Sequence, residues 1–338
     1  MDLNTTWFIL VGVLFAGYAI LDGFDLGVGM LHLFARTDVE RRTLLNAIGP
    51  VWDGNEVWLV TGGGAIFAAF PNVYATLFSG FYIPFMLLLT ALIFRAVSIE
   101  FRGKQAHGPW RTFWDGCFFI GSLVATILLG TLVGNLAWGI PLDARHEYAG
   151  GFWNLLHPYA LLVAITTVAL FLMHGSIFLL MKTEGELHER IRVWVRRAMI
   201  FFIMCYVITT MCTLLYVPRM GQPFRDHPAW GFIALLNMLA IANVPREIFY
   251  KRDFNAFLSS CVAIICLMAL LAIGLFPNMI PSNPDPANSL DIWQGASSTK
   301  TLGIMLIIAL IGMPLVVAYT FGIYWVFRGK VKVDPASY

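Results

Sequence analysis

Charged side chains are scarce in this 338-residue chain: Asp, Glu, Lys and Arg make up 12% of it, against 59% hydrophobic residues. Its mean hydropathy is +0.74. Soluble globular domains carry roughly 25% charged residues, and a soluble protein of this composition could not cover its core with polar surface. The formal net charge of +2 is too small to indicate a nucleic-acid partner. These shortages indicate a helical protein that crosses a membrane many times.

Signals for metal and covalent haem binding are also missing. The five cysteines, Cys117, Cys205, Cys212, Cys261 and Cys266, all lie in apolar runs and form neither C-x-x-C nor C-x-x-C-H. No two histidines form an obvious axial pair, since His157 and His174 lie roughly 25 Å apart along one helix at 1.5 Å per residue. The N-terminal MDLNTTW has no basic region, so no cleaved signal peptide is expected.

Long apolar runs are what the chain does contain. About nine segments approach or exceed the roughly 20 residues that a helix needs to cross the hydrocarbon layer. They cover residues 7–34, 48–70, 74–99, 113–138, 153–181, 197–217, 229–245, 254–279 and 302–327. Because no long linker separates them, residues 1–338 are expected to form one integral-membrane domain. The longest interruption, 277–300, is expected to be an ordered external loop.

Basic residues indicate the orientation, because cytoplasmic loops carry an excess of Lys and Arg. One alternating set of loops holds most of the Lys and Arg. The other set, which includes the N-terminus, holds only Arg145, Arg219, Arg225 and Lys300. With nine spans, this alternation predicts a periplasmic N-terminus and a cytoplasmic C-terminus.

Four carboxylates interrupt the first two segments, where each charged group costs a few kcal/mol. Asp22 and Asp25 form one i,i+3 pair, and Asp53 and Glu56 form another, so each pair lies on one helix face. In the predicted orientation both pairs lie in the cytoplasmic half of the membrane. Arg95, in the third segment, lies near the same side.

Two interpretations of these acids stay open. A neutralised or ion-paired cluster, with Arg95 as the cation, would hold the helices together. Alternatively, the carboxyl groups would relay protons between water and a buried reaction centre. The second is favoured because several acids meet at one depth with a single basic residue.

Two further features accompany the acids. Gly23 and Gly27 have the G-x-x-x-G spacing that lets another helix approach closely. Trp52 and Trp58 flank the acids of the second segment and are candidates for lining an apolar channel or packing on a lipid-soluble ring. Ordinary helix packing would explain these tryptophans equally well.

Several motifs resemble subunit II of cytochrome bd-type quinol oxidases, closest to the cyanide-insensitive branch. They are DGFDLGVG (22–29), PVWDGNEVWLVTGGGAIFAAFP (50–71), FSGFYIPF (78–85), FRAVSIEFR (94–102) and GELHER (185–190). The resemblance covers most of the chain and is densest in its N-terminal third.

This resemblance implies two four-helix bundles plus one peripheral helix in the bacterial inner membrane. It also implies a respiratory complex that oxidises ubiquinol or menaquinol and reduces O2 to water, with ubiquinol as the expected substrate. The partner, subunit I, would carry haem b and haem d-type or b-type groups and the quinol-oxidation site. This chain would complete the heterodimer, together with membrane lipid and candidate small single-helix subunits. A structural quinone in this chain is a further implication.

The resemblance also assigns roles to individual residues. Asp25 and Asp53 match acids of a proton pathway to the haems, with Asp22 and Glu56 as their neighbours. Relatives often carry Gln where this chain has Glu56. Trp58 matches a tryptophan near a proposed oxygen route, and Trp52 is a second candidate contact for oxygen or quinone.

Arg95 and Glu100 are the candidate charge partners for these acids, and neither a catalytic nor a metal-binding residue is expected in this chain. From the residues alone, a proton-coupled secondary transporter using the same acids is the alternative function. The chain shows no matching pair of short helices broken by Gly or Pro to favour it. A purely structural partner of the haem subunit is the third hypothesis.

Overall fold

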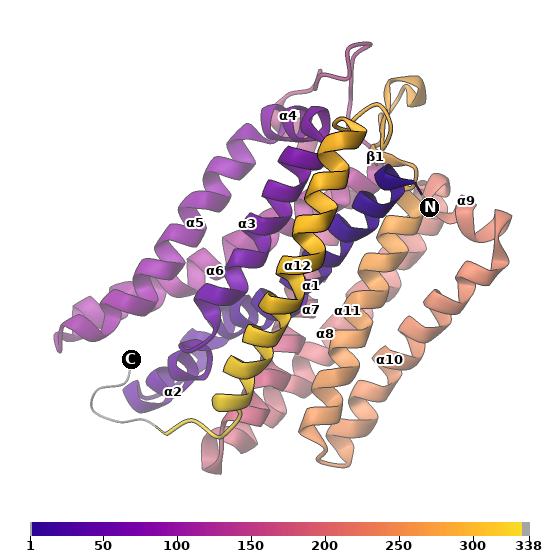
Figure 1. The fold of residues 1–338 in the computed structure, drawn as a ribbon. Coiled ribbons are helices and arrows are strands. Elements are labelled where there is room, and N and C mark those ends of the chain that lie inside the picture. Colours follow the sequence, from indigo (N-terminus) through magenta and orange to yellow (C-terminus); the bar gives the residue numbers. More distant parts are fainter. Residues whose placement is uncertain (1, 333–338) are drawn as a thin grey trace.

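Residues 2–332 are described by the computed structural model. Their secondary structure comprises many helices and one short pair of strands (Figure 1). The longer helices are α1 (Leu3–Leu31), α3 (Trp52–Ala69), α5 (Tyr82–Phe101), α6 (Gly108–Trp138), α7 (Pro158–Lys182), α8 (Gly185–Tyr216), α10 (Gly231–Phe249), α11 (Asp253–Leu275) and α12 (Thr299–Val326). Shorter helices are α2 (Asp38–Ile48), α4 (Pro71–Gly80) and α9 (Pro218–Asp226), with 3-10 turns η1 (His32–Phe34), η2 (Arg102–Lys104), η3 (Phe152–Leu156), η4 (Pro228–Trp230) and η5 (Pro286–Asn288).

Eight helices within residues 2–332 are long and apolar enough to cross a membrane. They correspond to eight of the predicted segments. The ninth, 48–70, corresponds to α3, which is absent from this set. Polar Asp53, Asn55 and Glu56, followed by three consecutive glycines, dilute its apolar character. Even so, α3 runs from the end of the molecule that carries α2 to the end that carries α4 (Figure 1).

The prediction of one continuous helix over 74–99 is wrong. The chain breaks at Phe81, where α4 ends and α5 begins. Gly80 precedes the break, and Pro84 lies in the first turn of α5, where its missing N–H leaves no intrahelical bond unmade.

Helix α8 begins well before the predicted start at residue 197. Its basic first half is too polar for a membrane span, yet Leu187, Ile191 and Val195 recur every four residues and are buried. This spacing places them on one helix face. The helix therefore extends beyond the apolar run that a hydropathy criterion detects.

Helices α1 and α7 form the centre of the molecule and pack with very little between them. A Cβ atom on Gly27 would overlap the carbonyl oxygen of Phe171 and crowd Gly175 in α7. A Cβ on Gly23 would lie 2.8 Å from the Phe171 ring. The G-x-x-x-G pair thus faces α7, and the two backbones approach closely because neither glycine has a side chain.

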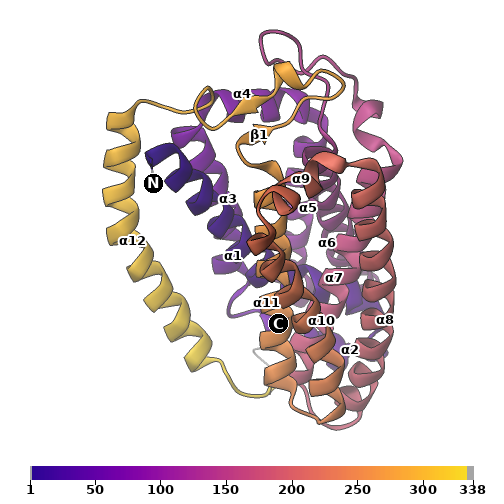
Figure 2. The same cartoon turned by 90° about the vertical axis from the view of Figure 1, so that its right-hand side faces the viewer.

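Helix α12 stands apart from this centre (Figure 2). Only 6% of its most apolar window is buried. Near its first turn, Trp7 Nε1 donates to the Leu302 carbonyl oxygen (2.9 Å). Near its last turn, the Tyr324 hydroxyl donates to Asn55 of α3 (2.8 Å). The helix is therefore attached to the bundle toward both ends.

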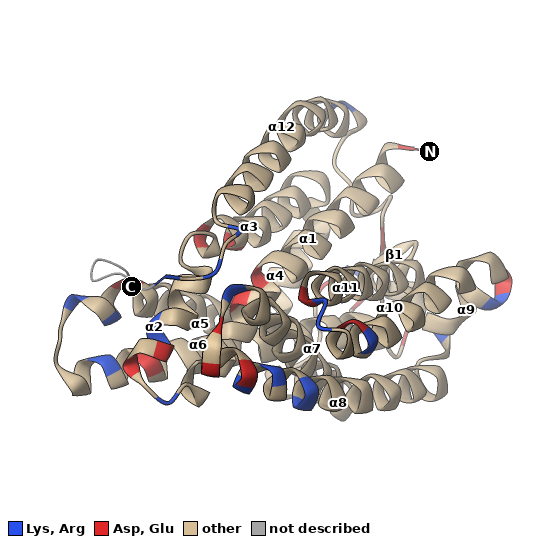
Figure 3. Ribbon diagram, turned by 90° about the horizontal axis from the view of Figure 1, so that it is seen from below, with Lys and Arg blue, Asp and Glu red and all other residues tan. Residues whose placement is uncertain are grey.

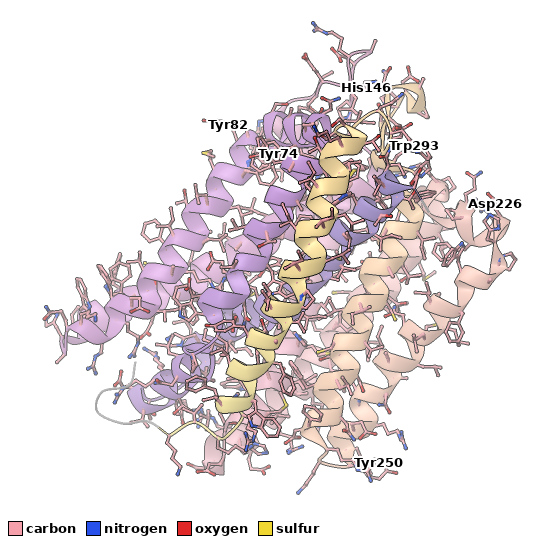
Figure 4. All side chains as sticks on the ribbon, in the orientation of Figure 1. Tyr74, Tyr82, His146, Asp226, Tyr250 and Trp293 are labelled. Carbon is pink, nitrogen blue, oxygen red and sulfur yellow. The ribbon has the colours of Figure 1, made fainter. Side chains whose placement is uncertain are left out.

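The expected external loop 277–300 contains strands β1 (Asn278–Ile280) and β2 (Leu290–Asp291), which pair antiparallel. It packs on the connection between α6 and α7, where His146 Nδ1 lies 2.8 Å from the Asn288 carbonyl oxygen. Figure 4 places His146 and Trp293 at this end of the molecule and Tyr250 at the opposite end.

Candidate functional site

Asp22 of α1 and Arg95 of α5 form a fully buried ion pair. Both guanidinium Nη atoms donate to the two carboxylate oxygens, with Arg95 Nη1 lying 2.9 Å from Oδ2. Such a bidentate geometry is the strong form of a charged hydrogen bond. Glu56 of α3 lies 3.8 Å from Arg95 Nη1 and is half-buried. The Asp22–Arg95 ion pair links α1 to α5.

Asp25, three residues further along α1, has a different environment. It is fully buried, and its Oδ2 accepts a hydrogen bond from Asn55 Nδ2 (2.7 Å). Its other oxygen, Oδ1, has no hydrogen-bond partner among the described residues. Among residues 2–332, no Lys, Arg or His side chain forms an ion pair with Asp25. A proton can therefore bind to or leave Asp25 without breaking an ion pair.

Tyr324 of α12 connects this carboxyl group to one end of the molecule. Its hydroxyl donates to Asn55 Oδ1, so Asn55 bridges Tyr324 and Asp25. Tyr324 also lines a cavity of about 320 Å³ at the end of the molecule where α7 and α12 end. A chain of hydrogen bonds thus runs from Tyr324 at this cavity through Asn55 to the buried Asp25.

Within the described residues, the second pair of predicted acids makes no hydrogen bond with Asp25. Asp53 lies in the first turn of α3, and its side chain is exposed. Glu56 lies one turn further along, beside Arg95. Glu100 is half-buried on α5, five residues after Arg95. The two carboxyl groups that the resemblance assigns to the pathway, Asp25 and Asp53, do not contact each other.

Trp58 and Trp52 also differ from each other. Trp52 is half-buried and packs against the main apolar core. The Trp58 ring lies against Gly17 of α1, where a Cβ atom would overlap it. Trp58 and Phe321 line an apolar cavity of about 330 Å³ between α3 and α12, and Tyr324 lines this cavity as well.

Two residues of this hydrogen-bond chain, Asn55 and Tyr324, were not predicted from the amino-acid sequence. Asn55 could have been found, because it lies between Asp53 and Glu56 in the same polar turn. Tyr324 carried no such signal, because it lies far from any acid along the chain. Only folding α12 against α3 brings its hydroxyl to Asn55.

A second polar cluster lies at the charged end of the molecule, seen from below in Figure 3, and was also missed. Asp115 of α6 is fully buried, and its Oδ1 lies 2.5 Å from both His32 Nε2 and Arg102 Nε. Its Oδ2 accepts from Arg41 Nη1 (2.7 Å). The sequence signal was an acid within the apolar run 113–138. With three partners joining η1, α2 and η2 to α6, Asp115 reads as a structural anchor.

An ion pair at the same end joins α2 to α8. Arg190 Nη2 donates to Glu40 Oε2 (2.6 Å). Burial raises the pKa of Glu40, but hydrogen bonds from Arg190 and from the Arg36 amide outweigh it and hold this pKa below its ordinary value. Glu40 is thus charged at neutral pH and serves the packing of these helices.

His174 of α7 is fully buried, and each of its ring nitrogens has a hydrogen-bond partner. Nδ1 lies 2.7 Å from the Ser260 hydroxyl, and Nε2 lies 2.9 Å from the Ile20 carbonyl oxygen. The ring stacks on Phe257. Across the described residues, no group of three or more His, Cys, Asp or Glu side chains could hold a metal ion.

Comparisons with known proteins agree over nearly the whole chain. The family model described as cytochrome bd terminal oxidase subunit II matches residues 3–327. The chain is 35% identical over 364 residues to cytochrome bd-I ubiquinol oxidase subunit 2 of Escherichia coli (strain K12), covering 98% of this chain and 96% of that protein. It is 37% identical over 342 residues to cytochrome bd ubiquinol oxidase subunit 2 of Bacillus subtilis (strain 168), covering 100% and 99%.

A solved structure shows the same fold. A chain of the bd oxidase from Geobacillus thermodenitrificans superposes on this one with a TM-score of 0.80. The match covers 97% of this chain and 99% of that chain at 17% sequence identity. At this identity the likeness concerns the fold alone.

Proposed function

The chain belongs to the cytochrome bd terminal oxidase subunit II family, and from this premise we propose that it is the non-haem partner of a haem-bearing subunit I. The complex would oxidise ubiquinol, the substrate in the names of its relatives, and reduce O2 to water. Subunit I would carry haem b and haem d-type or b-type groups. The assignment of the haems to subunit I is supported by His174 of this chain, because both of its ring nitrogens have hydrogen-bond partners and neither is free to bind haem iron.

Within that complex, the role that we assign to this chain is to deliver protons through Asp25. The observation that carries the proposal is the environment of this carboxyl group: it is fully buried, and one of its oxygens has no hydrogen-bond partner among the described residues. A buried polar group of this kind calls for an explanation, since most are satisfied. We explain the oxygen of Asp25 that has no partner as a site that binds and releases a proton.

The neighbours of Asp25 take separate parts in this proposal. Asn55 does not carry the proton; its amide holds Asp25 Oδ2 and leaves Oδ1 as the atom that gains and loses it. Tyr324 in turn fixes the orientation of Asn55. Exposed Asp53 and half-buried Glu56 form the outer part of the path, where they collect protons from water.

The experiment is quinol-driven O2 uptake by the purified complex, normalised to its haem content. Replacing Asp25 with Asn should slow turnover by roughly 100-fold, the low end of what a positioned proton-transfer group contributes, with haem content unchanged. Asp53→Asn should slow it less, because water can substitute for an exposed acid. Wild-type rates in both variants would leave the acids structural, as the third hypothesis holds.

A further part of the proposal is nine membrane crossings with the N-terminus periplasmic and the C-terminus cytoplasmic. Support comes from α3, which joins opposite ends of the bundle (Figure 1), and from the uneven distribution of Lys and Arg. The two four-helix bundles implied by the resemblance belong to the same proposal, with α12 as the peripheral helix.

The apolar cavity beside Trp58 supports a secondary role, because O2 dissolves better in apolar surroundings than in water. A route for O2 past Trp58 and Phe321 would start at the lipid-facing side of α12. A structural quinone or a lipid chain in this cavity would block the route, and identifying the molecule that co-purifies with the complex decides between these occupants and O2. The transporter alternative loses its support, because the family consists of oxidase subunits.

A further inference from the structure

The cavity at the end of α7 and α12 is basic. Lys182, Lys330 and Lys332 line its volume of about 320 Å³, and none of its lining residues within the described chain is acidic. Each ammonium group has three donors. Lys182 Nζ donates to the Phe327 carbonyl oxygen and Lys330 Nζ to that of Leu180 (2.9 Å). Lys332 makes no hydrogen bond or ion pair with the described residues.

Lys182 and Lys330 each donate a hydrogen bond to a backbone carbonyl oxygen, and this structural role alone is the simplest explanation of their positions. Lys330 Nζ and the Val331 amide cap carbonyl groups in the last turn of α7, where cations are stabilised by the helix dipole. This task uses one donor of Lys330 and leaves Lys332 unused. The three ammonium groups around this cavity share it with no carboxylate of residues 2–332.

An apolar cavity shares one lining residue with the basic one. Tyr324 lines both cavities, and beyond it the second cavity of about 330 Å³ is lined by Trp58, Val317 and Phe321. Helix α12 is fixed to the bundle toward both ends. The lining of the second cavity is apolar and would accept an apolar group such as an acyl chain.

The basic cavity lies at the depth where lipid headgroups are found. Trp325 is exposed at the end of α12, and the Arg328 guanidinium lies 4.1 Å from the centre of its ring. Exposed Trp residues beside cations mark the interface between hydrocarbon and water. Basic pockets between membrane helices on the cytoplasmic side are suited to anionic lipid headgroups.

We propose that these two cavities form a binding site for one anionic phospholipid. Its phosphate group lies among Lys182, Lys330 and Lys332, and one acyl chain fills the space between α3 and α12 against Trp58 and Phe321. The lipid thereby fixes α12 beside Asn55 and Tyr324. This proposal does not depend on the proton path, because it rests on the lining of the two cavities and on the interfacial position of Trp325 and Arg328.

The test uses the complete, delipidated oxidase complex and native mass spectrometry, with phosphatidylglycerol added as the probe. Lys330→Gln/Lys332→Gln should weaken phosphatidylglycerol binding roughly 30-fold, as expected for two interfacial charges. The matched control is Lys104→Gln/Lys251→Gln, which removes two exposed lysines at the same end of the molecule but away from the cavity. Its affinity should equal that of the wild type. Lys332→Gln alone keeps the bond of Lys330 to α7 and should give an intermediate loss.

Three further arms identify the occupant. Phosphatidylcholine should bind weakly and equally to all variants, and inorganic phosphate alone should not raise the thermal stability of the complex as phosphatidylglycerol does. Stabilisation by inorganic phosphate, lost in Lys330→Gln/Lys332→Gln, would overturn the lipid assignment in favour of a free anion. Equal binding of phosphatidylglycerol to both double variants would overturn the site. A quinone that co-purifies in the cavity, in equal amounts in the wild type and in Lys330→Gln/Lys332→Gln, would also overturn the site.

Discussion

At the scale of single residues, two aspartates one helical turn apart lie in different environments. Asp22 is locked to Arg95, whereas Asp25 has only an amide partner and one oxygen with no partner in the described chain. The i,i+3 spacing predicted a polar cluster around both, because it puts them on the same face, and only the resemblance singled out Asp25 for the proton pathway. What separates them is which neighbouring helix supplies the partner: α5 supplies a guanidinium and α3 an amide.

Removing the cation should show that Asp22 is structural. Arg95→Met leaves Asp22 and Glu56 without a counter-charge inside the protein, and breaking a buried pair on one side costs about 3–5 kcal/mol. Thermal unfolding of the purified complex should shift to clearly lower temperature. The double variant Asp22→Asn/Arg95→Met should recover most of the loss. Equal stability of the single variant and the wild type would contradict the ion pair.

Tyr324 is a positioning residue that we expect to affect the maximal rate. Tyr324→Phe removes the hydroxyl that holds Asn55 and should lower kcat for O2 reduction by roughly tenfold, the equivalent of about 1.4 kcal/mol, while KM for quinol stays unchanged. Tyr319→Phe is the matched control, since this tyrosine is exposed on the same helix. A change in KM alone, or equal rates in both variants, would argue against the positioning role.

At the scale of helices, long apolar runs predicted most of the elements, and the errors have local causes. Gly80 and Pro84 permit the break at Phe81, which hydropathy alone passes over because both sides are apolar. The early start of α8 arises from an amphipathic stretch with little total hydropathy. The contact of Tyr324 with Asn55 depends on how α12 lies in three dimensions, and no local pattern encodes it.

Close packing of α1 on α7 should be sensitive to a single methyl group. Gly27→Ala places a Cβ on the Phe171 backbone, which cannot move as a side-chain end could, and overpacking of this kind costs about 1–3 kcal/mol. We expect a lower midpoint of thermal unfolding for the complex. Gly12→Ala, on the same helix with open space around it, should leave the midpoint unchanged. Identical midpoints in the two variants would contradict the contact.

At the scale of the whole molecule, the distribution of charge and the path of the chain agree. Acidic and basic residues gather at the end that carries α2 (Figure 3), and the buried acids of α1 lie between that end and the centre of the helix. Composition was enough to predict a polytopic helical protein, because so few charged residues cannot cover a soluble surface. The number of crossings was harder to predict, since α3 combines a spanning path with a polar composition.

Counting crossings has a direct test. With nine spans, the two ends of the chain lie on opposite sides of the membrane, so a fluorescent protein fused at the C-terminus should fold and fluoresce in the cytoplasm. An N-terminal epitope tag should be accessible from the periplasm. If both ends report the same side, α3 does not cross and the proposed topology is wrong.

Proton delivery through Asp25 is tested most directly by following proton uptake itself. Fully reduced complex in liposomes is mixed with O2, and a pH-sensitive dye reports proton uptake from the side that carries the ends of α7 and α12. We expect the wild type to take up protons as O2 is reduced. In Asp25→Asn, with its haems intact, both events should be slowed together by roughly 100-fold. Uptake by Asp25→Asn at the wild-type rate would contradict the proposal.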